Sequence, residues 1–215
     1  MEINVIGQGE KSYKPDQIVF DINISNVYKN YEEALVKGEE SVLEFLNEMK
    51  AFGFEFQNFK TVNYQIKDET EYKDNAYRKI GVRYIRGLTL KFDYDMKKMS
   101  EMIEASSKLK NAPRINVRYG LKDSKTAEMQ LFTDAYQNAK KQADIIANAA
   151  GLKVVRCAKT SIGEENNNYF SRTSYDHNDK MMSKCSAGAS DIMERTYTPQ
   201  DIVVEQEIFC VFIAE

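Results

Sequence analysis

The most restrictive feature of this sequence is a series of small residues spaced four apart. Ala135, Ala139, Ala143 and Ala147 form this series, and Leu131 and Ala127 extend the same spacing towards the N-terminus. A helix turns by about 100° per residue, so a four-residue step places these positions on one slowly winding stripe. Small side chains let a helix approach its neighbour more closely than the usual axis separation of about 8–10 Å. The stripe predicts a long helix docked tightly on a sheet or a partner helix, although alanine's high helix propensity also contributes to the enrichment.

Signals at both ends set the limits of this helix. Asp123 precedes it and is suited to accept hydrogen bonds from the first helical turn. Gly151 follows it and can adopt the left-handed conformation in which many helices end. The candidate packing or interface residues of this helix are Ala135, Ala139, Ala143 and Ala147.

The flanking segments alternate between the periodicities of strands and helices. Residues 17–24 alternate apolar and polar side chains, with Ile18, Phe20, Ile22 and Ile24 on one side, which predicts a strand with one buried face. Residues 30–52 carry apolar side chains three and four positions apart and predict a helix. Further strands are expected at 3–9, 60–66, 80–94, 114–121, 152–162 and 201–213, and a further helix at 95–110. The polar residues 67–79 predict a hairpin tip.

The resulting order, β-β-α-β-β-α-β-α-β-β, favours an α+β fold of two lobes with antiparallel sheets and helices packed on one face. We expect a discontinuous outer lobe of residues 1–58 and 152–215. Residues 59–151 are expected to form an inserted ferredoxin-like lobe. The polar segment 164–195 is long for a loop, and loops of this length are usually functional or unstructured.

Composition restricts the class of function. The chain has 30 Lys and Arg against 33 Asp and Glu, a net charge of −3, with both signs interspersed. No nucleic-acid partner is expected, because such proteins carry a basic face. The longest apolar run, residues 208–214, is far shorter than the roughly 20 residues of a transmembrane helix. The opening MEINVIGQGE lacks the basic and apolar regions of an export signal. The chain as it stands is expected to be cytoplasmic, and exported or periplasmic only if a signal peptide has been removed.

A search for catalytic, cofactor or metal sites selects no residues. The single histidine, His177, lies in the polar segment, where nothing holds a nucleophile and a base in place beside it. The GQGE sequence at residues 7–10 lacks the third glycine and the following helix of a dinucleotide fingerprint. Cys and His do not have the spacing of a zinc site. We therefore expect no cofactor and no metal, and predict that the protein is not an enzyme.

Cysteine and tyrosine leave further interpretations open. The three cysteines do not form a disulfide framework, and Cys210 is expected to be a buried thiol. Cys157 or Cys185 would serve a thiol-based redox sensor or enzyme. Tyr72 and Tyr77 lie at the expected hairpin tip, where they either anchor a partner protein or simply cover strand faces.

Four segments together resemble the SIMPL-domain family, which includes bacterial periplasmic immunogenic and oxidative-stress-defence-type proteins. They are INVIGQGEKSYKPDQIVFDINI, LNEMKAFGFEFQNFKT, YRKIGVRYIRGLTLKFDYD and DAYQNAKKQADIIANAAGLKV. The resemblance covers nearly the whole chain and implies a SIMPL-type fold. It transfers no catalytic residue, because the family has none established. It implies links to export, envelope assembly and stress tolerance, and self-association of the kind seen in relatives that form ring-like homo-oligomers.

Together these features predict a non-enzymatic, self-associating scaffold or interaction module linked to envelope or stress functions, which would also bind a protein partner. Two alternatives remain beside it. One is a small-ligand binding protein with a pocket between the lobes. The other is the thiol-based redox sensor.

Overall fold

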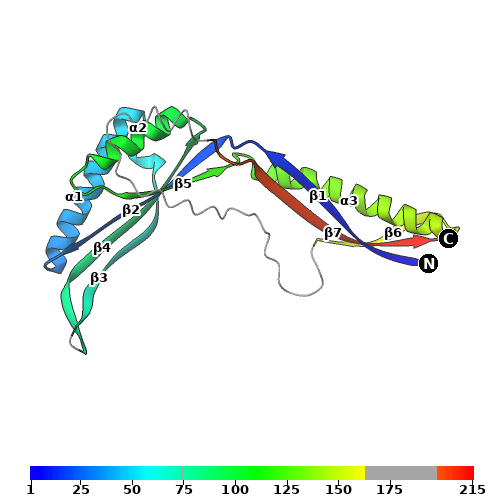
Figure 1. Ribbon diagram of the computed structural model, residues 1–215, viewed down its shortest axis with the longest axis horizontal. Helices are drawn as coiled ribbons and strands as arrows, with labels where there is room; N and C mark the ends of the chain where they lie inside the picture. The colour runs from blue at the N-terminus through cyan, green and yellow to red at the C-terminus, as the bar shows by residue number, and fades with distance from the viewer. Residues whose placement is uncertain (74, 163–197) are drawn as a thin grey trace. The chain divides into compact units, whose positions relative to one another are not determined.

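The computed structural model describes residues 1–73, 75–162 and 198–215. Its main elements follow the order β1, β2, α1, β3, β4, α2, β5, α3, β6, β7, as the sequence predicted (Figure 1). The strands form two antiparallel sheets. The predicted α+β class is therefore confirmed. The chain divides into two compact units, and each is described by itself.

The first unit contains a three-stranded sheet and one long helix. The sheet has the order β1-β7-β6, with β1 at Glu2–Tyr13, β7 at Ile202–Ala214 and β6 at Val154–Ser161. α3, at Ser124–Ala149, lies along one face of this sheet (Figure 1). The Asp123 carboxylate accepts a hydrogen bond of 3.0 Å from the Thr126 amide, and Gly151 has a φ of 73°. The predicted start and end of this helix are confirmed.

The alanine stripe of α3 is buried under the sheet of the same unit. Ala135, Ala139, Ala143 and Ala147 each have 0% of their surface exposed. They pack in one apolar cluster with β1 and β7 residues, including Val5 and Phe212. Of the two contacts that the stripe predicted, a sheet or a partner helix, the structure has the sheet.

Two glycines of β1 complete this contact from the other side. A Cβ added to Gly7 would lie 1.9 Å from the carbonyl oxygen of Ala135 and 2.7 Å from the Cβ of Ala139. A Cβ added to Gly9 would lie 2.4 Å from the carbonyl oxygen of Leu131. The backbones of β1 and α3 therefore approach most closely opposite Gly7, where neither carries more than a methyl group. The GQGE sequence has a packing role, which sequence analysis did not assign to it.

The second unit consists mainly of Asp16–Gly120. Its elements are β2 (Gln17–Tyr28), α1 (Tyr31–Met49), β3 (Lys60–Lys73), β4 (Ala76–Asp93), α2 (Met96–Ser107) and β5 (Arg114–Gly120), with short 3₁₀ turns at Lys50–Phe52 and Phe56–Asn58 between α1 and β3. The sheet order is β3-β4-β2-β5, and the β-α-β-β-α-β sequence of elements is ferredoxin-like (Figure 1). The four apolar residues predicted to form the buried face of β2 are at most 1% exposed, and they share one core with α1 and α2.

The two units do not coincide with the predicted lobes. The boundaries fall after residues 15 and 120, whereas the predicted inserted lobe was 59–151. β2 pairs with both β4 and β5, so it belongs to the ferredoxin-like sheet together with α1. α3 packs on β1 and β7, so it belongs to the other unit. These partners are far apart in sequence, and local periodicity does not reveal them.

The hairpin of β3 and β4 is longer than predicted. Pairing continues to Lys73 and Ala76, beyond the expected strand end at residue 66. A bulge interrupts β3 opposite Gly87 of β4, where the register shifts between Thr61 and Asn63. Val62 lies in that shift and is 65% exposed.

Candidate functional site

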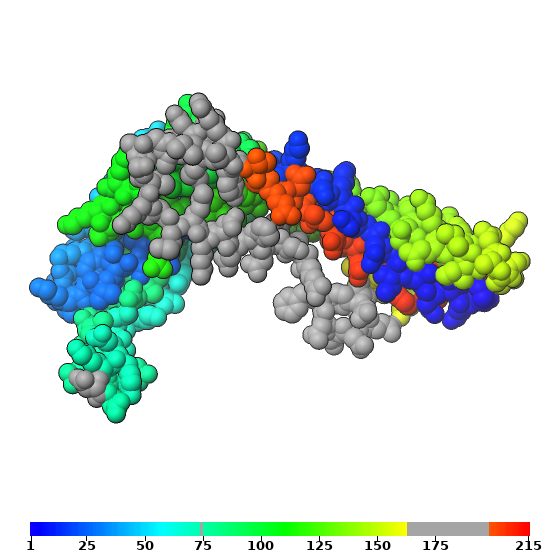
Figure 2. All heavy atoms as spheres, in the orientation of Figure 1, coloured from blue at the N-terminus to red at the C-terminus, as the bar shows by residue number. Residues whose placement is uncertain are grey.

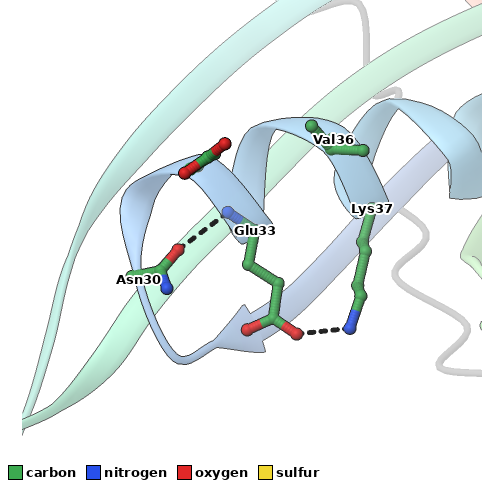
Figure 3. Close-up of a pocket in the computed structure, with 5 residues that line it drawn as sticks. Asn30, Glu33, Val36 and Lys37 are labelled. Carbon is green, nitrogen blue, oxygen red and sulfur yellow. Dashed lines mark hydrogen bonds and ion pairs between the residues drawn. The ribbon is translucent and has the colours of Figure 1, made fainter.

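A shallow pocket lies at the start of α1. It is lined by Asn30, Glu32, Glu33, Val36 and Lys37 (Figure 3). Its polar groups come from one helical turn and from the residue before that turn. The hydrogen bonds of these groups decide whether the pocket is a binding site or part of the helix end.

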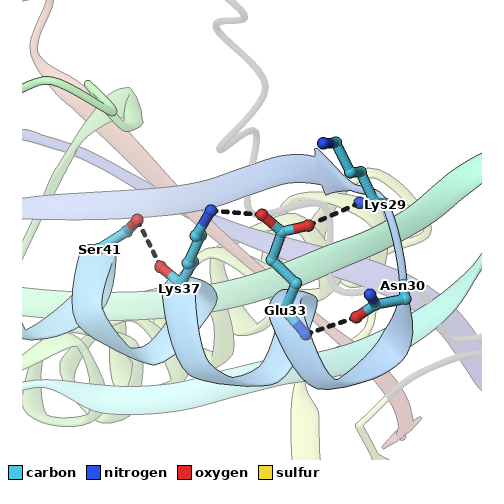
Figure 4. A network of polar contacts seen from close by, with 5 residues as sticks. All are labelled: Lys29, Asn30, Glu33, Lys37 and Ser41. Carbon is cyan, nitrogen blue, oxygen red and sulfur yellow. Dashed lines mark hydrogen bonds and ion pairs between the residues drawn. The ribbon is translucent and has the colours of Figure 1, made fainter.

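The polar side chains of this pocket are engaged in capping α1 (Figure 4). The Asn30 Oδ1 accepts from the Glu33 amide at 2.8 Å, and the Glu33 Oε2 accepts from the Lys29 amide at 3.2 Å. The Lys37 ammonium donates a hydrogen bond to the other Glu33 oxygen and forms an ion pair with it. This contact holds the pKa of Glu33 below its usual value. The bond to Asn30 satisfies an amide of the first helical turn, and the bond from Lys29, the residue before the N-cap, ties that residue to the helix. The pocket is therefore explained by helix capping, with Asn30 as the N-cap of α1.

A second polar group is buried between α1 and β4. Tyr84 has 0% of its surface exposed, and its hydroxyl donates to Glu39 Oε1 at 3.0 Å. The Tyr64 ring packs edge-on against it at a centroid distance of 5.8 Å, and Arg86 lies 5.0 Å from the Tyr64 ring centroid. Burial raises the pKa of Tyr84 well above its usual value. The protonated Tyr84 hydroxyl donates to Glu39 of α1, and this hydrogen bond ties the helix to the sheet. Sequence analysis did not identify Tyr84 or its pairing with Glu39.

No three His, Cys, Asp or Glu side chains gather as a metal site among residues 1–73, 75–162 and 198–215. None of the described helices has the length and apolar character needed to span a bilayer. His177, Cys185 and the polar segment 164–195 lie outside the described residues. The other candidate thiol, Cys157, lies within them.

The two described thiols lie in the first unit. Cys210 is buried, as predicted, and burial raises its pKa to about 11. At neutral pH it is therefore a protonated, weakly nucleophilic thiol. Cys157 is half-buried and packs against the apolar cluster that the alanine stripe forms with β1 and β7. Its Sγ donates to the Lys159 carbonyl at 3.4 Å.

The candidate interface tyrosines lie on neighbouring strands at the hairpin tip. Tyr72 and Tyr77 face each other across β3 and β4, with ring centroids 5.0 Å apart. They are 60% and 77% exposed, respectively. The four candidate alanines, in contrast, are enclosed between α3 and its sheet. Of these six candidate residues, the two tyrosines are exposed and the four alanines are not.

A comparison with protein families accounts for nearly the whole chain. The model of the SIMPL family, described as a protein of unknown function (DUF541), matches residues 3–212. The chain belongs to the SIMPL family. The match spans residues of both units of this SIMPL protein, and it includes Gly7, Gly9 and the alanine stripe of α3. A search of curated proteins found no match to this SIMPL chain.

Proposed function

We propose that this SIMPL protein acts through its surfaces, as a self-associating scaffold or interaction module linked to envelope or stress functions. The observation that carries the proposal is the exposed tyrosine pair at the end of a long hairpin. Tyr72 and Tyr77 expose most of their surface although their rings contact each other in a tilted arrangement. Tyrosine is enriched at protein interfaces because it buries a large area and keeps a polar end.

Ion pairs along the hairpin support this presentation. Arg83 Nε donates to Glu69 Oε2 at 2.6 Å in a two-pronged contact between β4 and β3. Lys79 and Asp68 form another cross-strand pair at 2.6 Å. Exposed pairs of this kind add little stability individually. They favour one pairing of the two strands, however, and a preorganised surface loses less entropy when it binds.

The proposal also agrees with the uses of the polar groups described above. The Glu33 cluster caps a helix, Tyr84 ties α1 to its sheet, and Cys210 is protonated. These groups hold structural positions, and they do not converge on a space where a substrate would react. Surface contact is the function best supported by this distribution.

Size-exclusion chromatography with light scattering over a series of concentrations tests self-association. We expect a mass that rises towards a multiple of the 24.8 kDa chain as concentration increases. A constant mass of 24.8 kDa up to the limit of solubility would contradict the proposal.

A further inference from the structure

The two described thiols lie on adjacent strands and on the same face of their sheet. Cys210 belongs to β7, the central strand, and Cys157 belongs to the edge strand β6. Figure 2 shows β7, in orange to red, beside β1, in blue, and β6 pairs with the other edge of β7. Pairing places Cys157 directly opposite Phe212, which shares a face of β7 with Cys210. Residues directly opposite each other also share a face, so both thiols point towards α3.

The side chains around these thiols form one apolar cluster. Cys210 is a buried member of it together with Phe212, and Cys157 packs against it. Tyr136 of α3 packs against the same cluster, with its ring centroid 6.1 Å from that of Phe212. Burial is the main cause that raises the pKa of Tyr136 and of Cys210, and in both cases the neighbouring Cys157 raises the pKa further. The two thiols and the Tyr136 hydroxyl therefore lie close together.

The diagonal position of the two thiols favours an ion between them over a disulfide bond. Diagonal neighbours in an antiparallel pair of strands lie about 7–8 Å apart. The Cα atoms of a disulfide are usually within about 6.8 Å of each other, so a direct bond between these sulfurs would require the strands to move. An ion bound by both sulfurs replaces the single S–S bond by two metal–sulfur bonds, and the longer bridge suits the wider separation.

The donor atoms select the kind of ion. Thiolate is a soft ligand, which suits copper(I) and does not suit magnesium or calcium. Zinc is held in most structural sites by four ligands, whereas no three His, Cys, Asp or Glu side chains gather in the described part of the chain. Copper(I) binds stably to two thiolates alone. The Tyr136 hydroxyl is a donor that can stabilise the charge of a thiolate after its proton has left.

We propose that Cys157 and Cys210 together bind one copper(I) ion on the α3 side of the sheet. Cys157 is half-buried on the edge strand and meets the ion first, and the enclosed Cys210 completes the site. Binding displaces both thiol protons, which leaves one net negative charge on the ion and its two thiolates. Arg156 and Lys159 flank Cys157 in β6 and place positive charge near this anion. The inference does not depend on the proposed self-association, because both ligands belong to one chain.

Anaerobic titration of the full chain with copper(I), in competition with the chromophoric chelator bicinchoninate, tests the proposal. The titration uses Cys185→Ser, which removes the third cysteine and leaves every described residue unchanged. We expect one copper(I) per chain and a new ultraviolet absorption from charge transfer between thiolate and copper(I). Cys157→Ser in the same background is expected to weaken binding by at least about a hundredfold, because one of two ligands is lost.

Val155→Ser is the matched control on β6, because Val155 is 58% exposed, and it is expected to leave the affinity unchanged. Equal affinities of Cys185→Ser with and without Cys157 would overturn the proposal. Cys210→Ala alters the core and is checked by circular dichroism. If it does not fold, X-ray absorption of copper-loaded Cys185→Ser tests the second ligand instead. Two sulfur neighbours around the copper are expected, and a single sulfur neighbour would contradict the site.

Discussion

Replacing Gly7 with alanine is expected to lower the free energy of unfolding by about 3 kcal/mol, near the upper end of the range for overpacked cores. The added methyl group would lie 1.9 Å from a backbone carbonyl oxygen, and backbone cannot rotate away as a side chain can. β1 and α3 would have to separate, which would open the contacts of the buried alanines. For a chain of this size, the melting temperature should fall by about 6–12 °C in a calorimetric scan.

Gly120→Ala is the matched control for this substitution. A Cβ at Gly120 would meet its nearest neighbour, the Gln17 Oε1, at 3.9 Å, which is ordinary contact distance. Its melting temperature is therefore expected to stay close to that of the wild type. Equal effects of the two substitutions would show that β1 and α3 are not in close contact at Gly7.

Enlarging the opposite side of the same contact is the second prediction. Ala139→Leu is expected to cost about 1–3 kcal/mol, because Ala139 is fully buried and faces Gly7. Denaturant unfolding in urea measures the loss as a lower midpoint with an unchanged slope. The helix propensities of Ala and Leu are close, so the change reports packing and not helix formation.

Lys141→Leu on the same helix is the control for Ala139→Leu, because Lys141 is exposed. Its unfolding midpoint should differ little from that of the wild type, since most exposed substitutions stay within about 0.5 kcal/mol. An unchanged midpoint in Ala139→Leu as well would mean that the alanine stripe does not determine how closely α3 approaches the sheet.

The element order and the ends of α3 could be predicted because they depend on neighbouring residues. The four-residue spacing, Asp123 and Gly151 define that helix without reference to the rest of the chain. The alternation at residues 17–24 likewise identified a buried strand face. Such local signals were sufficient for the α+β class.

The unit boundaries and the role of Gly7 could not be predicted, because they depend on which distant segments meet. The sequence shows a small residue at 7 and small residues on α3, but not that they are opposite each other. The tyrosines show the same limit. Tyr84 is fully buried beside Glu39, whereas Tyr64 is 43% exposed, although both lie on the same hairpin. Which of them α1 covers is determined by packing that periodicity does not record.

Hydroxyl-radical footprinting of the wild type at low and high protein concentration tests most directly whether this protein works by contact between its surfaces. The account predicts that oxidation of Tyr72 and Tyr77 at the hairpin tip falls at high concentration, while Ile146 on α3 is oxidised equally at both concentrations. Equal oxidation of the two tyrosines at both concentrations, with a mass of 24.8 kDa throughout, would contradict it.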